Sequence, residues 1–482
     1  MIGLSIAEVF CTTDLLASVK VNLHRVLNMA QSVGLAGPEQ NFLFDADSHH
    51  RGLYVRLKQD ELRNKSVVLM AVEQQQMMTF AQQQDIQQHY HISYCEQIHG
   101  CELMGDGDHL WAQQDEQQAK AKAGMAAHIV VASSPQPDAP HSELWRVGNE
   151  VRSLSSATFS TVLAPEVLDS ETTRSDDSQH AFVAKHLAWL IGALVLDFPL
   201  EDALIIARAS MNVSRETWPR DGHAFPVVSS VSGLSVSDSH QPLSDSHQLT
   251  QRSQFKAVHI EDLSLYPVVD DVIWVDKLLR LGVKTIQLRI KNPHQPDLEQ
   301  QIKQAVSLGR TYQAQVFIND YWQLAIQYQA FGVHLGQEDL HTADIQALHH
   351  AGICLGISTH GYWEILKAQQ LHPSYIALGH IFPTTTKQMP SQPQGLARLR
   401  LYQQLVDSIA RAHQLAIPTV AIGGIDLNNA ATVLEQGVSS LAVVRAVTQA
   451  ANTASAVDAF QQLFLSRKEQ SQSGRKGHVV TR

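Results

Sequence analysis

The chain has 482 residues, a length that predicts two or three domains, each able to bury a core of its own. Apolar residues make up 44% of it and charged residues 17%, a balance typical of globular proteins. The net charge of −11 provides no basic field for a nucleic-acid backbone. We therefore expect no nucleic-acid partner, whereas small phosphorylated ligands remain open.

No segment of the sequence predicts export or membrane insertion. The start, MIGLSIAEVF, lacks a basic leader and carries Glu8 where a signal peptide is apolar. The longest apolar run, AWLIGALVLDFPL, is interrupted by Asp197 and Pro199 and is too short to span a bilayer. We expect a cytoplasmic protein with no membrane contact.

Residues 1–220 predict an α/β module of uncertain, non-catalytic role. The segment AKHLAWLIGALVLDFPLEDALIIARASMNVSRETWP is faintly similar to the C-terminal helices of hydroxymethylpyrimidine phosphate kinases, which are ribokinase-like enzymes. Such a kinase needs a glycine-rich loop before these helices, so that backbone N–H groups can approach a phosphate. This chain has no glycine between Gly148 and Gly192, which indicates a degenerate module.

Residues 221–262 are predicted to form a linker. Their composition becomes rich in Ser, His and Gln, and SDSHQ occurs twice, at 237–241 and 244–248. Metal binding by these histidines is the alternative to a solvated spacer, which we favour. At the other end of the chain, the polar residues 466–482 predict a disordered tail.

Residues 263–465 alternate β-branched apolar runs with segments of helical period. The runs are SLYPVV, TIQLRI, QVFIND, GVHLG, CLGIST, YIALGH, PTVAIGG and SLAVVRAV. Strands that alternate with helices form a parallel sheet, and eight such units predict a closed (β/α)8 TIM barrel. An open doubly wound sheet is the alternative.

A barrel carries its reactive side chains where its strands end, because the loops after the strands build the site. Gln287, Arg289 and Lys291 run through the end of the second strand, and alternation puts them on one side of it. Buried cationic side chains need anionic partners, so these three residues predict an anion site.

Carboxylates follow the next two strands. Asp320 comes directly after Asn319 at the end of the third strand, and Asp339 follows the fourth. Two carboxylates suit Mg²⁺, which completes its coordination with water and ligand phosphates. Helix capping is the alternative role, more so for Asp339 than for Asp320.

The later strands carry further anion-binding groups. Ser358 ends the fifth strand, the loop GHIFPTTTKQ with Lys387 follows the sixth, and Gly423 and Gly424 follow the seventh. Hydroxyl, ammonium and backbone N–H groups all donate hydrogen bonds to an oxyanion, and late strands often bind phosphate in this architecture. Two phosphorylated ligands and no activated nucleophile predict a transfer in which a metal-held pyrophosphate departs.

Residues 264–450 resemble thiamine-phosphate synthases. The motifs QLRIK, INDYWQLA, GVHLGQEDL, GISTHG, YIALGHIFPTTTKQMPSQPQGL and PTVAIGGI stand in the family's order and spacing. The resemblance implies a transferase of thiamine biosynthesis that joins hydroxymethylpyrimidine diphosphate to hydroxyethylthiazole phosphate, with Mg²⁺ as cofactor. It implies a dissociative mechanism, in which pyrophosphate leaves before the thiazole nitrogen attacks.

The resemblance also implies the roles of individual residues. Pyrimidine diphosphate is expected to contact Gln287, Leu288, Arg289, Ile290, Lys291, Asn319, Ser358 and Lys387. Thiazole phosphate is expected to contact Thr384, Thr385, Thr386, Gly423, Gly424, Val444 and Arg445. Asp320 and Asp339 would hold Mg²⁺, while Arg289, Lys291 and Lys387 would act catalytically on the leaving group. Arg445 departs from the family, which usually has a small residue there.

A second hypothesis keeps the barrel without the coupling reaction. The chain would then be a relative of the thiazole tautomerases, or a regulator that binds a phosphorylated ligand. Lys291, Asp320, Asp339 and Lys387 together favour the transferase, because a sensor has no need of groups that stabilise a leaving group.

Overall fold

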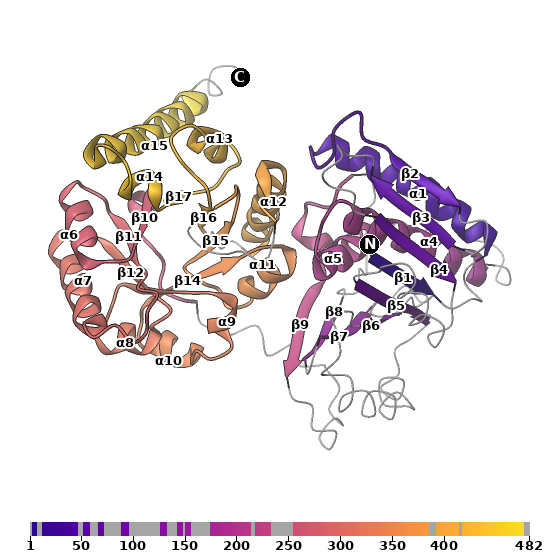
Figure 1. Cartoon of the computed structure of the whole chain (residues 1–482), viewed down its shortest axis with the longest axis horizontal. Helices are drawn as coiled ribbons and strands as arrows, with labels where there is room; N and C mark the ends of the chain where they lie inside the picture. Colours follow the sequence, from indigo (N-terminus) through magenta and orange to yellow (C-terminus); the bar gives the residue numbers. More distant parts are fainter. Residues whose placement is uncertain are drawn as a thin grey trace. The chain divides into compact units, whose positions relative to one another are not determined.

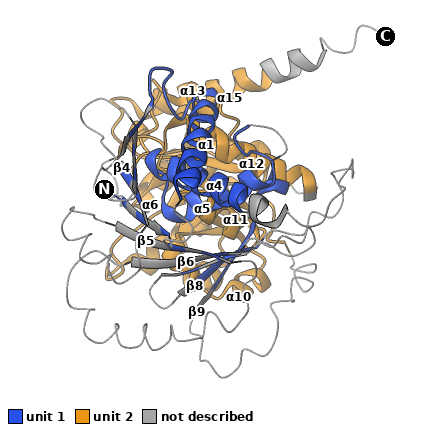
Figure 2. Ribbon diagram, turned by 90° about the vertical axis from the view of Figure 1, so that its right-hand side faces the viewer, with its two compact units in different colours: residues 1–241 blue, residues 242–482 orange. Residues whose placement is uncertain are grey.

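The computed structural model describes residues 2–6, 12–46, 52–57, 66–71, 88–95, 126–132, 142–147, 150–155, 174–213, 217–232, 254–384, 392–413 and 417–476. The chain divides into two compact units, residues 1–241 and residues 242–482, and each is described by itself (Figures 1 and 2). Within the described ranges, no helix combines the length and the apolar character that crossing a membrane requires.

The first unit contains a mixed sheet of nine described strands in the order β2-β3-β4-β1-β5-β6-β7-β8-β9. The central pairs β1–β4, β1–β5 and β5–β6 are parallel, and the remaining pairs are antiparallel. The bounds are β1 (Ile2–Ile6), β2 (Phe42–Ala46), β3 (Gly52–Leu57), β4 (Ser66–Ala71), β5 (Gln88–Cys95), β6 (Ala126–Ala132), β7 (Ser142–Val147), β8 (Glu150–Ser155) and β9 (Val227–Ser232).

Helices α1 (Thr13–Ser32), α4 (Arg174–Val195) and α5 (Leu200–Met211) accompany this sheet, so the predicted α/β class is confirmed. Helix α4 packs against α1 and α5 and contacts β3 and β4. Its apolar run is therefore the core of the unit, and Leu187 and Ile191 are fully buried. A turn at Asp197 and Pro199 separates it from α5.

The first unit continues beyond residue 220, so the predicted linker of residues 221–262 starts too early. A short 3-10 helix, η2 (Gly222–Ala224), precedes β9, and β9 pairs antiparallel with β8 from Val227 to Ser232. Val228 is buried whereas Val227 is exposed, as alternation along an edge strand requires. Both SDSHQ repeats lie outside the described residues.

The second unit contains a closed barrel of eight parallel strands in the order β10 to β17, and β10 pairs with β17. This topology confirms the predicted TIM barrel and excludes an open sheet. The bounds are β10 (Leu265–Val269), β11 (Thr285–Leu288), β12 (Gln315–Asn319), β13 (Gly332–Leu335), β14 (Cys354–Thr359), β15 (Tyr375–Gly379), β16 (Thr419–Ile422) and β17 (Ser440–Val443).

Helices follow the strands and surround them (Figure 1). Helix α6 shows why they form: the Asp271 side chain accepts from the Ile273 N–H at its start, and the helix buries Val275 and Leu278. The bounds are η4 (Ile260–Asp262), α6 (Val272–Arg280), α7 (Leu298–Tyr312), α8 (Trp322–Gln327), α9 (Gln337–Leu340), α10 (Ile345–His350), α11 (Tyr362–Gln369), α12 (Gly395–His413), α13 (Ala430–Leu434), α14 (Arg445–Thr448) and α15 (Thr453–Lys476).

Both ends of the second unit differ from the prediction. Before β10, the buried side chains of Phe255 and Val258 belong to the barrel and not to a linker. After β17, α15 continues to Lys476, so much of the predicted tail of residues 466–482 is helical. The last six residues lie outside the described ranges.

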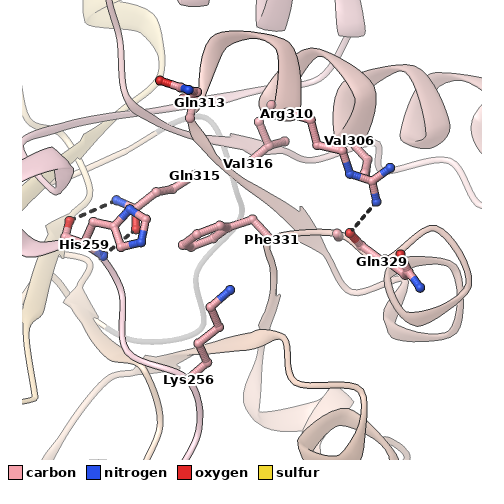
Figure 3. Close-up of a pocket in the computed structure, with 12 residues that line it drawn as sticks. Lys256, His259, Val306, Arg310, Gln313, Gln315, Val316, Gln329 and Phe331 are labelled. Carbon is pink, nitrogen blue, oxygen red and sulfur yellow. Dashed lines mark hydrogen bonds between the residues drawn. The ribbon is translucent and has the colours of Figure 1, made fainter.

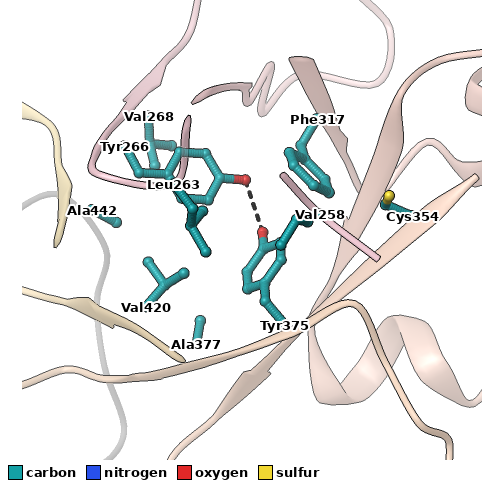
Figure 4. Packing of buried hydrophobic residues seen from close by; sticks show 10 residues of the cluster. All are labelled: Val258, Leu263, Tyr266, Val268, Phe317, Cys354, Tyr375, Ala377, Val420 and Ala442. Carbon is teal, nitrogen blue, oxygen red and sulfur yellow. Dashed lines mark hydrogen bonds between the residues drawn. The ribbon is translucent and has the colours of Figure 1, made fainter. Parts of the chain in front are cut away.

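Side chains fill the interior of the barrel (Figure 4). Tyr266, Phe317 and Tyr375 form its centre, with the two tyrosine hydroxyls 2.8 Å apart and the Phe317 and Tyr375 rings edge to face. The remaining members of this cluster are Val258, Leu263, Val268, Cys354, Ala377, Val420 and Ala442. The barrel is therefore a packed core, and ligands have room only at its ends.

Candidate active site at the mouth of the barrel

The end of β11 contributes one buried and two more accessible polar residues. Gln287 is 5% exposed, and its Nε2 donates to Tyr266 Oη at 3.3 Å inside the barrel. The strand ends at Leu288, so the expected alternation does not continue through Lys291. Arg289 is half-buried and Lys291 is exposed. The prediction that Lys291 is buried is therefore wrong.

Asn319 and Asp320 lie at the end of β12. Asn319 is 5% exposed, and Asp320 is half-buried with a φ of 66°. The backbone N–H of Asp320 donates to the His334 carbonyl at 3.0 Å, and its carbonyl accepts from Trp322 at 2.7 Å. A left-handed backbone at a residue with a β-carbon costs on the order of 1 kcal/mol, and Asp is one of the residues that adopt it most readily.

Asp339 lies in α9, directly after β13. Its Oδ2 accepts from the Gly336 N–H at 3.1 Å, so helix capping, the alternative role, is present in the structure. The two aspartates follow neighbouring strands, since Asn319 of β12 lies opposite His334 of β13. In the described part of the chain, no three His, Cys, Asp or Glu side chains gather as metal ligands.

Ser358 of β14 is half-buried and is held from two sides. His334 Nε2 lies 2.8 Å from its Oγ, and Gln337 Nε2 donates to its carbonyl at 2.7 Å. We did not predict His334 or Gln337. Both stand in the motif GVHLGQEDL, where His334 is a polar residue within an otherwise apolar buried strand and is itself only 7% exposed.

The threonine-rich loop after β15 is described only in part. Thr384 is half-buried. The other three predicted members lie outside the described residues: Thr385, Thr386 and Lys387.

Both described ends of this loop are attached to the late strands. On the outgoing side, Ile381 N donates to the Ile422 carbonyl and Phe382 N donates to the Gly423 carbonyl, each at 3.0 Å. On the return side, Gln394 N donates to the His380 carbonyl at 2.9 Å. The loop thus leaves and rejoins the barrel at the mouth, beside the end of β16.

Gly423 and Gly424 have a steric role at the same place. Their φ angles are 106° and 64°. A Cβ at Gly423 would lie 2.4 Å from the His380 Cβ, and one at Gly424 would lie 2.7 Å from the Phe382 Cβ. Only glycine lets the end of β16 approach the threonine-rich loop this closely.

Val444 and Arg445 follow β17. Val444 is half-buried and packs against the interior cluster, while Arg445 is exposed and begins the short helix α14. The backbone of Arg445 thus lies at the mouth, and its side chain extends into solvent.

Two histidines, His360 and His380, lie at the start of the threonine-rich loop. His360 donates through its backbone N–H and its Nδ1 to Glu364 Oε2, at 2.7 and 2.8 Å. Burial lowers the pKa of His380, and the nearby His360 lowers it further. Gln394 Nε2 joins the two sides by donating to the carbonyls of His360 and Gly379.

A separate hollow of about 310 Å³ lies at the opposite end of the strands, before β12 and β13 (Figure 3). Phe331 lies among its lining side chains, with Lys256 Nζ 5.3 Å from the ring centroid. Arg310 donates to the carbonyls of Tyr328 and Gln329 beside it. None of the predicted site residues that the structure describes lines this hollow.

Comparison with known proteins gives similarity over the barrel. A family model described as thiamine monophosphate synthase matches residues 265–447. The thiamine-phosphate synthase of Enterobacter sp. (strain 638) is 58% identical over 191 residues, which are 39% of this chain and 86% of that protein. The thiamine-phosphate synthase of Klebsiella pneumoniae is 56% identical over 197 residues, 41% of this chain and 89% of that protein.

Among solved structures, the thiamine phosphate pyrophosphorylase from Pyrococcus furiosus is 31% identical. The similarity covers 42% of this chain and 96% of that one, with a TM-score of 0.37.

Proposed function

The chain belongs to the thiamine-phosphate synthase family, and from this premise we propose which of its residues carry out the reaction. The barrel joins hydroxymethylpyrimidine diphosphate to hydroxyethylthiazole phosphate, which gives thiamine phosphate and releases pyrophosphate. The family match at residues 265–447 is the observation that carries this conclusion, because it contains all eight strands whose ends form the mouth.

Pyrimidine diphosphate would bind over the ends of β11, β12 and β14. Buried polar side chains, Gln287 and Asn319, offer hydrogen bonds next to the packed interior, and Ser358 adds a hydroxyl. The other contacts of this subsite would come from Leu288, Arg289, Ile290, Lys291 and Lys387. The buried groups suit the ring, and the accessible cations Arg289 and Lys291 suit the diphosphate.

Asp320 and Asp339 fit Mg²⁺. They follow neighbouring strands, and Mg²⁺ in proteins usually takes one or two carboxylates and completes its octahedron with water and ligand phosphates. The hydrogen bond from Gly336 occupies one oxygen of Asp339, and a carboxylate keeps lone pairs for a further partner. Bound there, Mg²⁺ would neutralise charge on the departing pyrophosphate.

Thiazole phosphate would bind where the threonine-rich loop meets β16 and β17. The hydroxyls of Thr384, Thr385 and Thr386 would donate to the phosphate, together with backbone N–H groups at Gly423, Gly424, Val444 and Arg445. The attachment of both described loop ends beside Gly423 supports this assignment, because it holds the loop against the glycines.

The chemistry then needs positive charge rather than a nucleophile. As the bond to the pyrimidine breaks, negative charge develops on pyrophosphate, and Arg289, Lys291 and Lys387 would stabilise it. The packed interior below Gln287 closes the barrel on that side, so that both substrates meet at the mouth.

An assay with the purified full-length protein, both substrates and Mg²⁺ tests the function. We expect thiamine phosphate and pyrophosphate to form in equal amounts, and to form only when both substrates are present. A protein that binds both substrates and forms no product would contradict the proposal and favour a regulator.

We also propose that the first unit takes no part in the coupling. The family match begins at residue 265, after the last described strand of that unit. The similarity of its helices to phosphate kinases stays a prediction from the sequence.

A further inference from the structure

Five side chains form a continuous hydrogen-bonded chain inside the barrel, which we call the tyrosine network. Gln287 Nε2 lies 3.3 Å from Tyr266 Oη. Tyr266 Oη in turn lies 2.8 Å from Tyr375 Oη (Figure 4). Tyr375 Oη lies 2.7 Å from His334 Nδ1, and His334 Nε2 lies 2.8 Å from Ser358 Oγ. The network thus connects two residues of the proposed pyrimidine subsite through three that are not assigned to it.

One arrangement of protons supplies every contact of this network with a donor and an acceptor. In it, the Gln287 amide N–H donates to Tyr266, and the Tyr266 hydroxyl donates to Tyr375. Tyr375 in turn donates to His334 Nδ1, which leaves the imidazole proton on Nε2, where it donates to Ser358 Oγ. The opposite direction would place two donors on the Tyr266 oxygen and leave the proton of Tyr266 without an acceptor in the network.

Both tyrosine hydroxyls of the network stay protonated and can therefore donate hydrogen bonds. Burial raises the pKa of Tyr266 and the pKa of Tyr375 well above the ordinary value, so both phenols keep their protons. Tyr375 is fully buried, stacks on His334 with an interplanar angle of 16°, and meets Phe317 at 89°.

Gly356 of β14 makes room for the Tyr375 phenol. A Cβ at position 356 would lie 2.1 Å from the Tyr375 Cζ, so no other residue fits without a change in the ring position. The phenol thus occupies the space that a side chain at position 356 would fill, and its hydroxyl lies 2.7 Å from His334 Nδ1.

We infer that Tyr375 is a positioning residue for the coupling reaction, which acts through the His334 tautomer on the hydroxyl of Ser358. Because His334 occupies one lone pair of Ser358 Oγ as a donor, the Ser358 hydroxyl proton is directed to another acceptor. In the mouth, that acceptor would be a ring nitrogen or an oxygen of the pyrimidine diphosphate. The inference rests on the proposed function, since it assigns Ser358 to that ligand.

A double-mutant cycle tests the inference with the full-length protein. The variants are Tyr375→Phe, Ser358→Ala and their combination, and the quantity is kcat/KM for pyrimidine diphosphate. Tyr375→Phe keeps the ring and removes the hydroxyl that bonds Tyr266 and His334, so we expect a loss of roughly tenfold. In the Ser358→Ala background the same change should cost less than about twofold, because the hydroxyl it orients is gone.

A matched control separates positioning from packing. Tyr402 of α12 is 1% exposed, lies outside the network and meets Tyr362 edge to face at 4.8 Å. Tyr402→Phe should change kcat/KM by less than about twofold in both backgrounds. The KM for thiazole phosphate should stay constant in all variants that keep their melting temperature.

The outcomes decide between the two proposals. Losses that multiply in the Tyr375→Phe, Ser358→Ala double variant, or equal losses in Tyr375→Phe and Tyr402→Phe, would overturn the inference and leave the proposed function intact. A wild-type protein without coupling activity would refute the proposed function, and the inference with it. If Tyr375→Phe fails to fold, His334→Asn takes its place in the cycle, with the same non-additivity expected.

Discussion

Each unit buries a group of polar side chains around a histidine, but only one of the two groups is charged. In the first unit, Glu143 Oε1 accepts from His186 Nε2 at 3.1 Å and from Arg208 Nε at 2.7 Å, and all three side chains are at most 1% exposed. We call these residues the ionic cluster. The tyrosine network of the barrel is neutral along its length and ends at the mouth.

The ionic cluster is incompletely paired. Glu143 Oε2 and both terminal nitrogens of Arg208 have no hydrogen-bond partner among the residues that the structure describes. Burial alone would raise the pKa of Glu143, but Arg208 and His186 outweigh it and hold the pKa below its ordinary value. The comparison teaches that a buried ion pair makes each partner necessary to the other, whereas a neutral directed network can transmit an orientation to a binding site.

The largest effect is expected from Arg208→Met, which removes one partner of the ionic cluster. A buried Glu143 that keeps only His186 as a partner should lower the free energy of unfolding by about 3–5 kcal/mol, measured by urea denaturation of the full-length protein. Arg152→Met is the control, because Arg152 pairs with Glu201 near the surface and should cost less than about 1 kcal/mol. Equal losses in both variants, or a change in coupling kinetics, would break the contrast between the two units.

Asp320→Asn should affect the reaction and leave the stability of the fold unchanged, the opposite of what is expected for Arg208→Met. Asparagine accepts the left-handed backbone at position 320, while the loss of charge should lower kcat about 100-fold at saturating substrates and Mg²⁺. The control is Asp344→Asn at the start of α10, where the side chain only caps the Ala347 N–H. A kcat near that of the wild type would remove Asp320 from the proposed mechanism.

Arg445→Ser should have a smaller effect, limited to one substrate. Arg445 is exposed, so any contact with thiazole phosphate is screened, and the KM for that substrate should rise about two- to fivefold. The KM for pyrimidine diphosphate should not change. Arg280→Ser on α6 is the control, because Arg280 pairs with Asp276 on the outer surface. Unchanged constants for both substrates would place Arg445 outside the site.

The smallest effect is expected when the first unit is removed. A fragment of residues 254–476 contains the closed barrel and α15, and its kcat should stay within about twofold of the full-length value. Circular dichroism would verify that the fragment is folded. A folded fragment with much lower activity would show that the first unit contributes to the coupling.

The barrel was predictable because its strands are buried on both faces. Each strand reads as a short apolar run bounded by turns, and the regular alternation with helices leaves few arrangements. Two parts of the candidate site could be identified from the sequence: the carboxylates and the threonine-rich loop. Both follow apolar strand segments directly, where polar residues stand out. Their assigned roles stay predictions.

Other features depend on contacts between distant segments. The run VVSSVS looked like the start of a linker, since its partner β8 is separated from it by two helices of the chain. His334 and Tyr375 are 41 residues apart in the chain, and no local sequence pattern indicates the hydrogen bond between them. The exposure of Lys291 follows from β11 ending at Leu288, and strand ends are poorly determined by local sequence.

The closure of the barrel sets an order of events during translation. β10 pairs with β17, and Leu265 lies opposite Leu441. The ring of strands can therefore close only after β17 has been synthesised. The sheet of the first unit has all of its described strands once residue 232 is made. At ordinary rates of synthesis, the ribosome needs roughly 10–40 s for the intervening stretch to residue 443. From the synthesis of β10 until then, the nascent barrel presents an open β10 edge, which the finished barrel does not have.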